Sequence, residues 1–357
     1  MHRCGYCDFT VVAGRDHLID EYLRALECEL QGLETPRNVE TLFFGGGTPT
    51  HLAPHQLRRL FEIVGRWVVP VEGCEWSVEA NPADLTDEKI EVLCEAGVNR
   101  VSLGVQSLDA EVLKTLERDH RPDEAIARTR ARFANVAVDL IFGVPGQSPS
   151  LWEETLQRTI ATGVVHLSTY GLTIEKGTTF WSRRKKGTLV PPFDELQREM
   201  YAAAMRIASA AGFEQYELSN FARGGFRCRH NDVYWNALPY FAFGPGAARY
   251  VDGRRETNHR STSAWMKRLF AGRSPVAESE ELSDEERARE ALVLGIRRIE
   301  GVDRETFLAQ TGFSLDDLAH EAIARNVEGG LLEESATGLQ LTYEGRFLAD
   351  SVVVDLL

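Results

Sequence analysis

The chain is poor in cysteine and has no long apolar run. Its 357 residues include six cysteines, and no apolar leader stands at the amino terminus. We therefore expect reduced thiols in the cytoplasm, with metal or redox roles, and no disulfide framework. The longest apolar runs, such as 140–142 and 352–354, are far too short to cross a bilayer, so no membrane span is expected. Cys28 and Cys94 fall within helical apolar patterns and are expected to be buried.

Basic residues are also in deficit. The chain has 40 Lys and Arg against 54 Asp and Glu, which gives a net charge of -14. A nucleic-acid partner needs a basic face for its phosphates, so none is expected. The one dense basic run, 183–186, is predicted to be a solvated loop. What remains is the composition of an ordinary globular protein, long enough for one large domain and a smaller one.

Apolar, β-branched runs recur roughly every thirty residues through the first two-thirds of the chain, as the strands of βα units do. Amphipathic stretches separate them: Leu18, Tyr22, Leu26 and Leu30 share one helix face, and Thr86 is expected to cap a helix. The pattern predicts an α/β protein with a parallel sheet or barrel, whose chemistry lies at the carboxyl ends of the strands. The predicted strands are 39–44, 76–79, 101–105, 136–141 and 165–170.

Turn-forming and charged residues become dense over 272–281 and indicate a boundary. Ser283 then begins a capping box that opens a helix. Further helices, a hairpin with its turn at Gly338 and a last helix after Thr342 make a winged-helix-like layout. Because this segment is not basic, a structural or partner-docking role is favoured over DNA binding. The predicted division is a barrel in 1–200, an extension in 201–277 and a C-terminal domain in 278–357.

The first residues contain a C-x-x-C motif, formed by Cys4 and Cys7. Taken alone, this motif is compatible with a thioredoxin-like redox site, a zinc site or an iron–sulfur site. A thioredoxin-like site needs a preceding strand, and a zinc site needs a second ligand pair. The sequence contains no second C-x-x-C motif and no closely spaced pair of histidines. This context favours the iron–sulfur interpretation.

The motif resembles the signature of the radical S-adenosylmethionine (SAM) family, C-x-x-x-C-x-x-C with an aromatic residue before the last cysteine. Cys4, Tyr6 and Cys7 match its last two cysteines and its aromatic residue. The resemblance implies a [4Fe–4S] cluster held by three thiolates, SAM on the open iron and an electron donor for the cluster. The family's first cysteine and first strand would precede Met1. We expect that a valine codon within Cys-Val-His-Arg-Cys was read as the start codon. The in-frame codon just upstream tests this expectation, because it must encode cysteine.

Polar and glycine-rich motifs at the strand ends strengthen the resemblance. Residues 45–50 match the family's GGGTP[ST] loop, where backbone without side chains lets a ligand approach closely. Polar side chains that end apolar strands are costly to bury unless a polar group binds them. The alternative for single residues is a strand-end hydrogen bond, or an ion pair between Arg118 and Asp139. The residues that the resemblance assigns to SAM are Tyr6, Gly46, Gly47, Thr48, Glu79, Gln106, Arg118 and Asp139.

Two features separate the branches of the coproporphyrinogen-oxidase-like group in this family. The anaerobic oxidases have a fourth cysteine two residues after the third, whereas this chain has Phe9 there, as the haem-chaperone branch does. His230, Tyr234 and Trp235 stand in a sequence similar to the H-N-x-x-Y-W haem motif of that branch. Imidazole ligates haem iron, and Tyr or Trp packs on a porphyrin face. The alternatives are a capped turn with two core aromatic residues and, for Cys228, a second haem ligand or a buried thiol.

The resemblance therefore implies an α/β fold with a partial (β/α)6 barrel for the cluster and SAM, a haem-binding extension and a helical, winged-helix-like C-terminal domain. The implied function is to bind haem and transfer it to client haem proteins in the cytoplasm. The alternative is an oxygen-independent coproporphyrinogen III oxidase, which decarboxylates propionate side chains through a radical. The sequence departs from the family at Ala248 and Arg249, where His-Ser is expected after the glycine stretch 244–247. That departure puts any role of these two positions in question.

Overall fold

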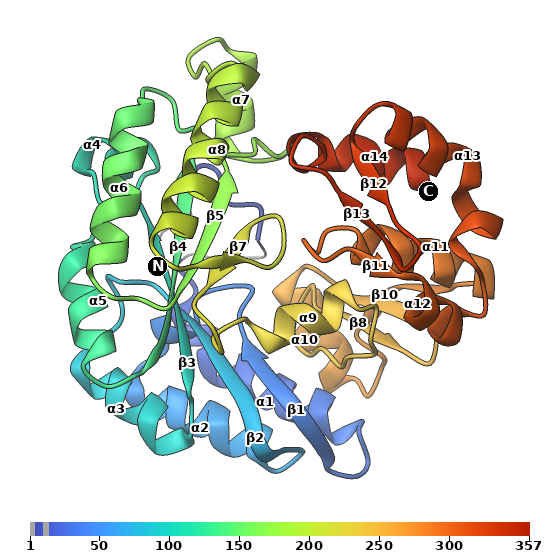
Figure 1. Cartoon of the computed structure of the whole chain (residues 1–357). Coiled ribbons are helices and arrows are strands. Elements are labelled where there is room, and N and C mark those ends of the chain that lie inside the picture. The colour runs from blue at the N-terminus through green and yellow to red at the C-terminus, as the bar shows by residue number, and fades with distance from the viewer. Residues whose placement is uncertain (1–3, 10–13) are drawn as a thin grey trace.

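The computed structural model describes residues 4–9 and 14–357. The expectation about the start of the chain, at Met1, lies outside the described residues. A curled, seven-stranded sheet dominates the first two-thirds of the molecule (Figure 1). Its first five strands are parallel and follow chain order, and two short antiparallel strands complete it. The strands, in sheet order, are β1 (Arg37–Phe44), β2 (Val68–Ala80), β3 (Arg100–Gln106), β4 (Asn135–Phe142), β5 (His166–Gly171), β7 (Asn220–Ala222) and β6 (Glu214–Gln215).

Helices cover the outer face of this sheet (Figure 1). Side chains that point outward from the strands, such as Val78, Leu103, Val138 and Leu167, are completely buried in one core with the helices. Thr86 caps α3 by accepting a hydrogen bond from the backbone N–H of Lys89, as expected. The segments are η1 (Asp16–Leu18), α1 (Ile19–Gln31), η2 (Pro49–His51), α2 (Pro54–Gly65), α3 (Asp87–Ala96), α4 (Ala110–Thr115), α5 (Pro122–Arg130), α6 (Pro149–Ala161), α7 (Thr179–Lys185) and α8 (Asp194–Ala210).

The α/β class and the partial barrel predicted from the sequence are confirmed. All five predicted strands are present, within one or two residues for most of their ends. β2 is the exception, because it begins well before the predicted 76–79. After the barrel, the chain forms a helix and a three-stranded antiparallel sheet in the order β10-β9-β8. These segments are α9 (Arg229–Trp235), β8 (Ala248–Val251), β9 (Arg254–Asn258), α10 (Thr262–Phe270) and β10 (Val276–Glu281).

The C-terminal segment has a hydrophobic core of its own, which is separate from that of the barrel. The predicted capping box is present, since Ser283 and Glu286 exchange hydrogen bonds at the start of α11. The predicted hairpin and final helix are also present. The segments are α11 (Asp284–Gly295), β11 (Val302–Asp303), α12 (Arg304–Thr311), α13 (Leu315–Glu328), β12 (Leu332–Glu334), β13 (Gly338–Leu341), η3 (Gly345–Leu348) and α14 (Ala349–Leu356). The division at 277/278 stays a prediction, and β10 continues across it.

Two local predictions are wrong. Cys28 is exposed, because it lies beside the apolar stripe of its helix, and Cys94 is half-buried, because it packs only against the margin of the core. The basic run is not a loop: Arg183, Arg184 and Lys185 form the last turn of α7, a position where cations interact favourably with the helix dipole. Arg183 also pairs with Glu117 at 2.6 Å.

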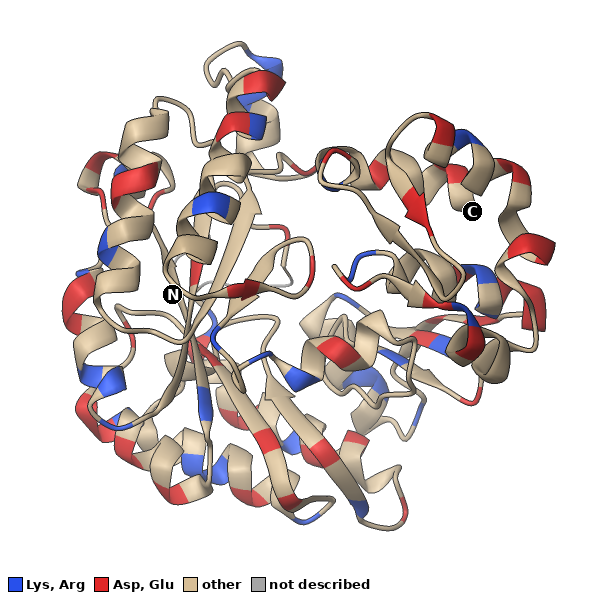
Figure 2. Cartoon of the chain, in the orientation of Figure 1, with Lys and Arg blue, Asp and Glu red and all other residues tan. Residues whose placement is uncertain are grey.

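Charge is distributed in small alternating groups. Figure 2 shows acidic and basic residues interspersed over the outer helices, and many of them form surface ion pairs. This pattern gives the visible face no continuous basic stripe of the kind that binds nucleic acid. Within the described residues, no helix combines the length and apolar character needed to cross a membrane.

Candidate functional site

The concave face of the half-barrel is polar. Along each strand the side chains alternate, so the residues between the buried outward-facing ones point inward. Ser102 on β3 and Asp139 on β4 are joined there, because the Ser102 hydroxyl donates to both carboxylate oxygens, at 3.1 and 3.3 Å. Ser168 on β5 also hydrogen-bonds to Asp139. Neither serine was predicted as a site residue from the sequence, although their alternation with buried apolar residues was a signal for an inward position.

Glu79 and the glycine loop form one edge of this concave face. The backbone N–H of Gly46 donates to a Glu79 carboxylate oxygen at 3.1 Å, and Gly46 has a φ of +81° that favours glycine. Gly45 has no room for a side chain: a Cβ there would lie 2.5 Å from the ring of Phe43 and 2.8 Å from Glu79. Gly47 and Thr48 follow in the same loop and line the adjacent cavity. The triple glycine thus lets the loop fold tightly over a carboxylate.

Two carboxylates lie near each other on this face. Burial raises the pKa of Glu79 to about 7, the negative charge of Asp139 adds to the shift, and the Gly46 N–H opposes it. Burial also raises the pKa of Asp139, against hydrogen bonds from Ser168 and Ser102 and the charge of Arg100. Among the described residues, Asp139 and Arg118 do not form the ion pair considered above, since Arg118 instead donates to the Tyr6 hydroxyl, at 3.2 Å from Nε and 2.9 Å from Nη2. Arg100 and Arg118 thus act on Asp139 through their charges, without forming an ion pair with it among the described residues.

The C-x-x-C segment lies at the same carboxyl end of the sheet. The backbone N–H of Cys7 donates to the carbonyl of Cys4 at 3.1 Å, which closes a tight turn, and the N–H of Phe180 donates to the carbonyl of Gly5 at 2.8 Å. Burial raises the pKa of the Cys4 thiol, and the nearby Arg118 charge opposes that shift. No cluster of three His, Cys, Asp or Glu side chains with metal-binding geometry occurs in the part of the chain described. This turn can thus contribute two thiolates to an iron–sulfur site.

Gln106 ends β3 in an unusual backbone conformation. Its φ is +67°, which non-glycine residues rarely adopt, and its side chain is buried. The register between β3 and β4 shifts just before it. Such strain persists where the surrounding structure enforces it, and it is common at binding sites. Gln106, Glu79, Asp139, Arg118 and Tyr6 therefore lie toward the carboxyl end of the half-barrel, and their contact with SAM stays a prediction.

The helix that carries the H-N-x-x-Y-W sequence, α9, is anchored to the barrel by Glu75. This carboxylate accepts hydrogen bonds from the backbone N–H groups of Arg229 and His230, both at 3.1 Å, and from the Cys228 thiol at 3.5 Å. Cys228 is buried, as the sequence analysis considered. Glu75 was missed because it acts as a helix cap from a strand about 150 residues away, which no local pattern reveals.

His230 is held from both sides of its ring. Its Nδ1 lies 2.8 Å from the Thr41 hydroxyl and its Nε2 lies 2.9 Å from the Tyr234 hydroxyl. Its face stacks on Phe43 with ring centroids 5.1 Å apart and planes 18° apart. Burial lowers the pKa of His230 to about 4, so the imidazole is neutral at physiological pH. Trp235 points elsewhere: its ring lies beneath the guanidinium of Arg297 on the C-terminal side.

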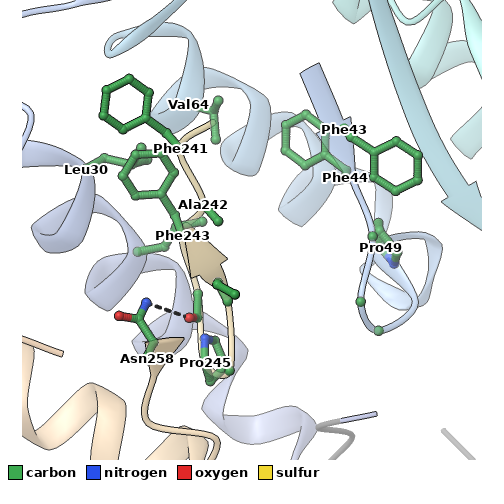
Figure 3. A pocket seen from close by; sticks show the side chains of 18 of the residues that line it. Leu30, Phe43, Phe44, Pro49, Val64, Phe241, Ala242, Phe243, Pro245 and Asn258 are labelled. Carbon is green, nitrogen blue, oxygen red and sulfur yellow. Dashed lines mark hydrogen bonds between the residues drawn. The ribbon is translucent and has the colours of Figure 1, made fainter. Parts of the chain in front are cut away.

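A cavity of about 2110 Å³ runs along the free edge of β1. Figure 3 shows Phe43, Phe44 and Pro49 on one wall and Phe241, Phe243 and Leu30 on the other. His230, Tyr234 and the glycine loop also line it. The buried Glu29 fixes the far wall by accepting from the backbone N–H of Gly244 at 2.8 Å and from the amide of Asn258 at 2.6 Å. The cavity is mostly apolar and joins the glycine loop to α9.

At the two positions that depart from the family, Ala248 and Arg249 begin β8. The Arg249 guanidinium is paired with the carboxylate of Glu256 on the neighbouring strand β9. Arg249 therefore has a structural partner within its own sheet.

Comparisons with known proteins agree with this architecture. The Radical SAM superfamily model matches residues 1–159, and the HemN C-terminal domain model matches residues 282–348. The chain is 36% identical to the heme chaperone HemW of Bacillus subtilis over 359 residues, which covers 98% of this chain and 95% of that protein. It is 34% identical to the Bos taurus mitochondrial radical S-adenosyl methionine domain-containing protein 1, covering 99% of this chain and 84% of that protein.

A solved structure has the same fold. Coproporphyrinogen III oxidase (HemN) from Escherichia coli superposes with a TM-score of 0.86 over 99% of this chain and 87% of that chain. The two sequences are 21% identical, so this likeness concerns the fold alone.

Proposed function

This chain belongs to the HemW family within the radical SAM superfamily, and from that premise we propose that it binds haem and transfers it to client haem proteins. The observation that carries the proposal is the position of His230. Its imidazole is neutral, borders the apolar cavity, and lies beside the strand that ends in the glycine loop. Two imidazoles line this cavity, those of His230 and of His51, and the His51 ring is bonded to Asp16 at 3.1 Å. A large apolar cavity with an imidazole available in its wall suits a flat, apolar ligand with a metal centre.

We propose that the carboxyl end of the half-barrel holds a [4Fe–4S] cluster and SAM. Cys4 and Cys7 would supply two of three thiolates, and the third would come from the cysteine expected just before Met1. The residues proposed for SAM are Tyr6, Gly46, Gly47, Thr48, Glu79, Gln106, Arg118 and Asp139. When bound, the cluster and SAM supply one-electron chemistry, which requires an electron donor. The residues suit this group because two buried carboxylates, of which Glu79 accepts from the Gly46 N–H and faces Asp139, attract the positive charges of SAM.

The third thiolate is tested by changing the start of the chain. We would express the unmodified chain, together with a version in which Met-Cys-Val replaces Met1, and reconstitute both anaerobically with iron and sulfide. The added cysteine should raise bound iron towards about 4 atoms per chain, with the absorbance of a [4Fe–4S] cluster. A serine in place of the added cysteine is the matched control. Equal iron content in all three proteins would contradict the proposed ligand set.

We propose His230 as the axial haem ligand, with Tyr234 packed against the porphyrin. The Nε2 atom is the candidate donor, and the Tyr234 hydroxyl that now lies 2.9 Å away would have to yield to iron. Its neutral state favours ligation, because a protonated imidazole cannot bind a metal. A haem contact of Trp235 is also proposed from the motif, although its ring now packs beneath Arg297.

Haem binding is tested by titrating the protein with haemin and following the Soret band. We expect His230→Ala to lose at least about tenfold in affinity, whereas His55→Ala, an exposed histidine on α2, should bind as the unmodified chain does. Equal affinity in both variants would refute the role of His230.

The oxidase alternative is tested separately. The reconstituted protein would be incubated anaerobically with coproporphyrinogen III, SAM and a reductant. Formation of protoporphyrinogen at many turnovers would overturn the chaperone proposal, and its absence, together with haem transfer to an apo-haem protein, would support it. The proposed setting is the cytoplasm, with client haem proteins and an electron donor as partners and no nucleic acid.

A further inference from the structure

Phe43 lies between the glycine loop and the histidine of α9. On one side, the position of a Cβ on Gly45 is only 2.5 Å from an edge carbon of the Phe43 ring. On the other side, the same ring stacks on the imidazole of His230 at 5.1 Å. The ring therefore lies between two segments that are about 185 residues apart in the sequence and is close to both.

The strand that carries Phe43 reinforces this connection. Thr41, two residues earlier on the same inward face of β1, lies 2.8 Å from Nδ1 of His230. β1 then leads directly into the glycine loop, where the Gly46 N–H is bonded to Glu79. The glycine loop and Glu79 are thus connected to the imidazole of His230 by direct contacts through β1.

We propose that Phe43 is a positioning residue through which the state of the SAM loop sets the orientation of His230. The proposal rests on the proposed function, because it takes the glycine loop as part of the SAM site and His230 as the haem ligand. A ligand that draws Glu79 or Gly46 towards itself shifts the ring of Phe43, and the imidazole moves with it. SAM and haem therefore bind to coupled sites, and each changes the affinity for the other by the same factor.

The coupling is measured by haemin titrations, followed by the Soret band, with and without saturating SAM. Anaerobically reconstituted full-length protein should show a change of about fivefold or more in haem dissociation constant when SAM is added. Phe43→Leu keeps the site apolar but removes the flat ring. The ratio of the haem dissociation constants without and with SAM should therefore fall to about 1 in this variant, while each ligand still binds. Phe61→Leu is the matched control: this buried ring of α2 packs against Phe44 and Trp76 in the outer core, outside the cavity lining, and its ratio should stay that of the unmodified protein.

A second measurement does not require haem. With histidine labelled by ¹³C, the Cε1–H signal of His230 is shifted by the ring current of Phe43, and adding SAM should move it in the unmodified protein but not in Phe43→Leu. The signal is assigned by its loss in His230→Ala. Thermal unfolding of each variant identifies a loss of folding, in which this signal would move to the position of histidines in an unfolded chain.

The outcomes separate this proposal from the one on which it rests. If the unmodified protein binds both SAM and haem but the ratio is 1, or if Phe43→Leu retains the full ratio, the coupling is refuted and the haem function stands. If the unmodified protein binds no haem or no SAM, the proposed function fails, and the coupling fails with it.

Discussion

Glu75 and Glu79 lie on the same inward face of β2, four residues apart, in contrasting surroundings. At the amino end of the half-barrel, Glu75 accepts three hydrogen bonds, from two backbone N–H groups of α9 and from the Cys228 thiol. At the carboxyl end, Glu79 accepts one, from Gly46, and faces the negative charge of Asp139. The first carboxylate joins two parts of the fold, and the second is left with capacity for a ligand.

The contrast shows that a buried carboxylate does not by itself mark a site. A group whose lone pairs are filled by the protein is structural, because replacing any partner would leave another group unsatisfied. A group held near a like charge with few donors is unfavourable in the protein alone, and it becomes favourable when a cation arrives. The number and charge of the partners therefore distinguish a structural carboxylate from one in a binding site.

The largest expected effect is on the free energy of unfolding, when Glu75 is replaced. Glu75→Ala removes the acceptor of three donors in a buried region, so we expect a loss of about 3 kcal/mol in the free energy of unfolding, measured by urea denaturation. Glu75→Gln keeps one carbonyl acceptor and should lose less. A loss below about 1 kcal/mol in Glu75→Ala would show that α9 does not depend on this cap.

The same contrast explains what could be predicted from the sequence. Glu79, Gln106 and Asp139 were assigned to SAM by the family resemblance, because each stands in a short motif visible within a few residues. Glu75 was not, since it stands just before the predicted strand 76–79 and its partners come from Cys228, Arg229 and His230, whose position is set only by the three-dimensional packing of α9 on β1. Local periodicity reveals which way a side chain points, but not what it meets.

The H-N-x-x-Y-W residues show the same limit. Sequence similarity placed His230, Tyr234 and Trp235 together as a haem site, whereas in the fold His230 and Tyr234 face the barrel and Trp235 faces the C-terminal domain. Both packing directions follow from the position of one short helix, α9, between the half-barrel and the C-terminal segment (Figure 1). The ring contact between Phe43 and His230 was equally invisible, because strand and helix are brought together only by the closure of the barrel.

The two ends of the half-barrel should also respond to pH in opposite directions. The pKa of His230 is lowered to about 4 from 6.5, so between these values the unfolded chain binds a proton that the folded chain does not, and stability falls as the pH falls. The pKa of Glu79 is raised to about 7 from 4.5, so between these values the folded chain holds the extra proton, and stability falls as the pH rises.

Urea unfolding at pH 5 and pH 7 separates the two contributions. Relative to the unmodified protein, Glu79→Gln should gain about 2 kcal/mol of stability on going from pH 5 to pH 7, because the cost of ionising Glu79 is absent. His230→Gln should lose a similar amount relative to the unmodified protein over the same interval. Differences of the same sign in the two variants would contradict the contrast between the two ends.

A smaller effect is expected on SAM affinity. Glu79→Gln removes the charge but keeps the shape, so SAM should bind about tenfold more weakly to anaerobically reconstituted protein, as measured by equilibrium dialysis at pH 8. The exposed Glu62 on α2 provides the matched control, Glu62→Gln, which should bind SAM normally. In the unmodified protein, SAM affinity should increase as the pH rises through about 7, because Glu79 ionises there. Unchanged affinity in Glu79→Gln would place Glu79 outside the SAM site.

The smallest effect concerns the hydroxyl that now occupies Nε2 of His230. Tyr234→Phe removes this hydroxyl but keeps the ring that we expect to pack on the porphyrin, so haem should bind about fivefold more tightly, equivalent to the roughly 1 kcal/mol of one net hydrogen bond. Tyr240→Phe is the control, because Tyr240 packs edge-on against Tyr234 without a hydrogen bond to the imidazole in the described structure. Weaker haem binding in Tyr234→Phe would show instead that the hydroxyl takes part in binding haem. His230 would then be set by the barrel alone, through Thr41 and Phe43.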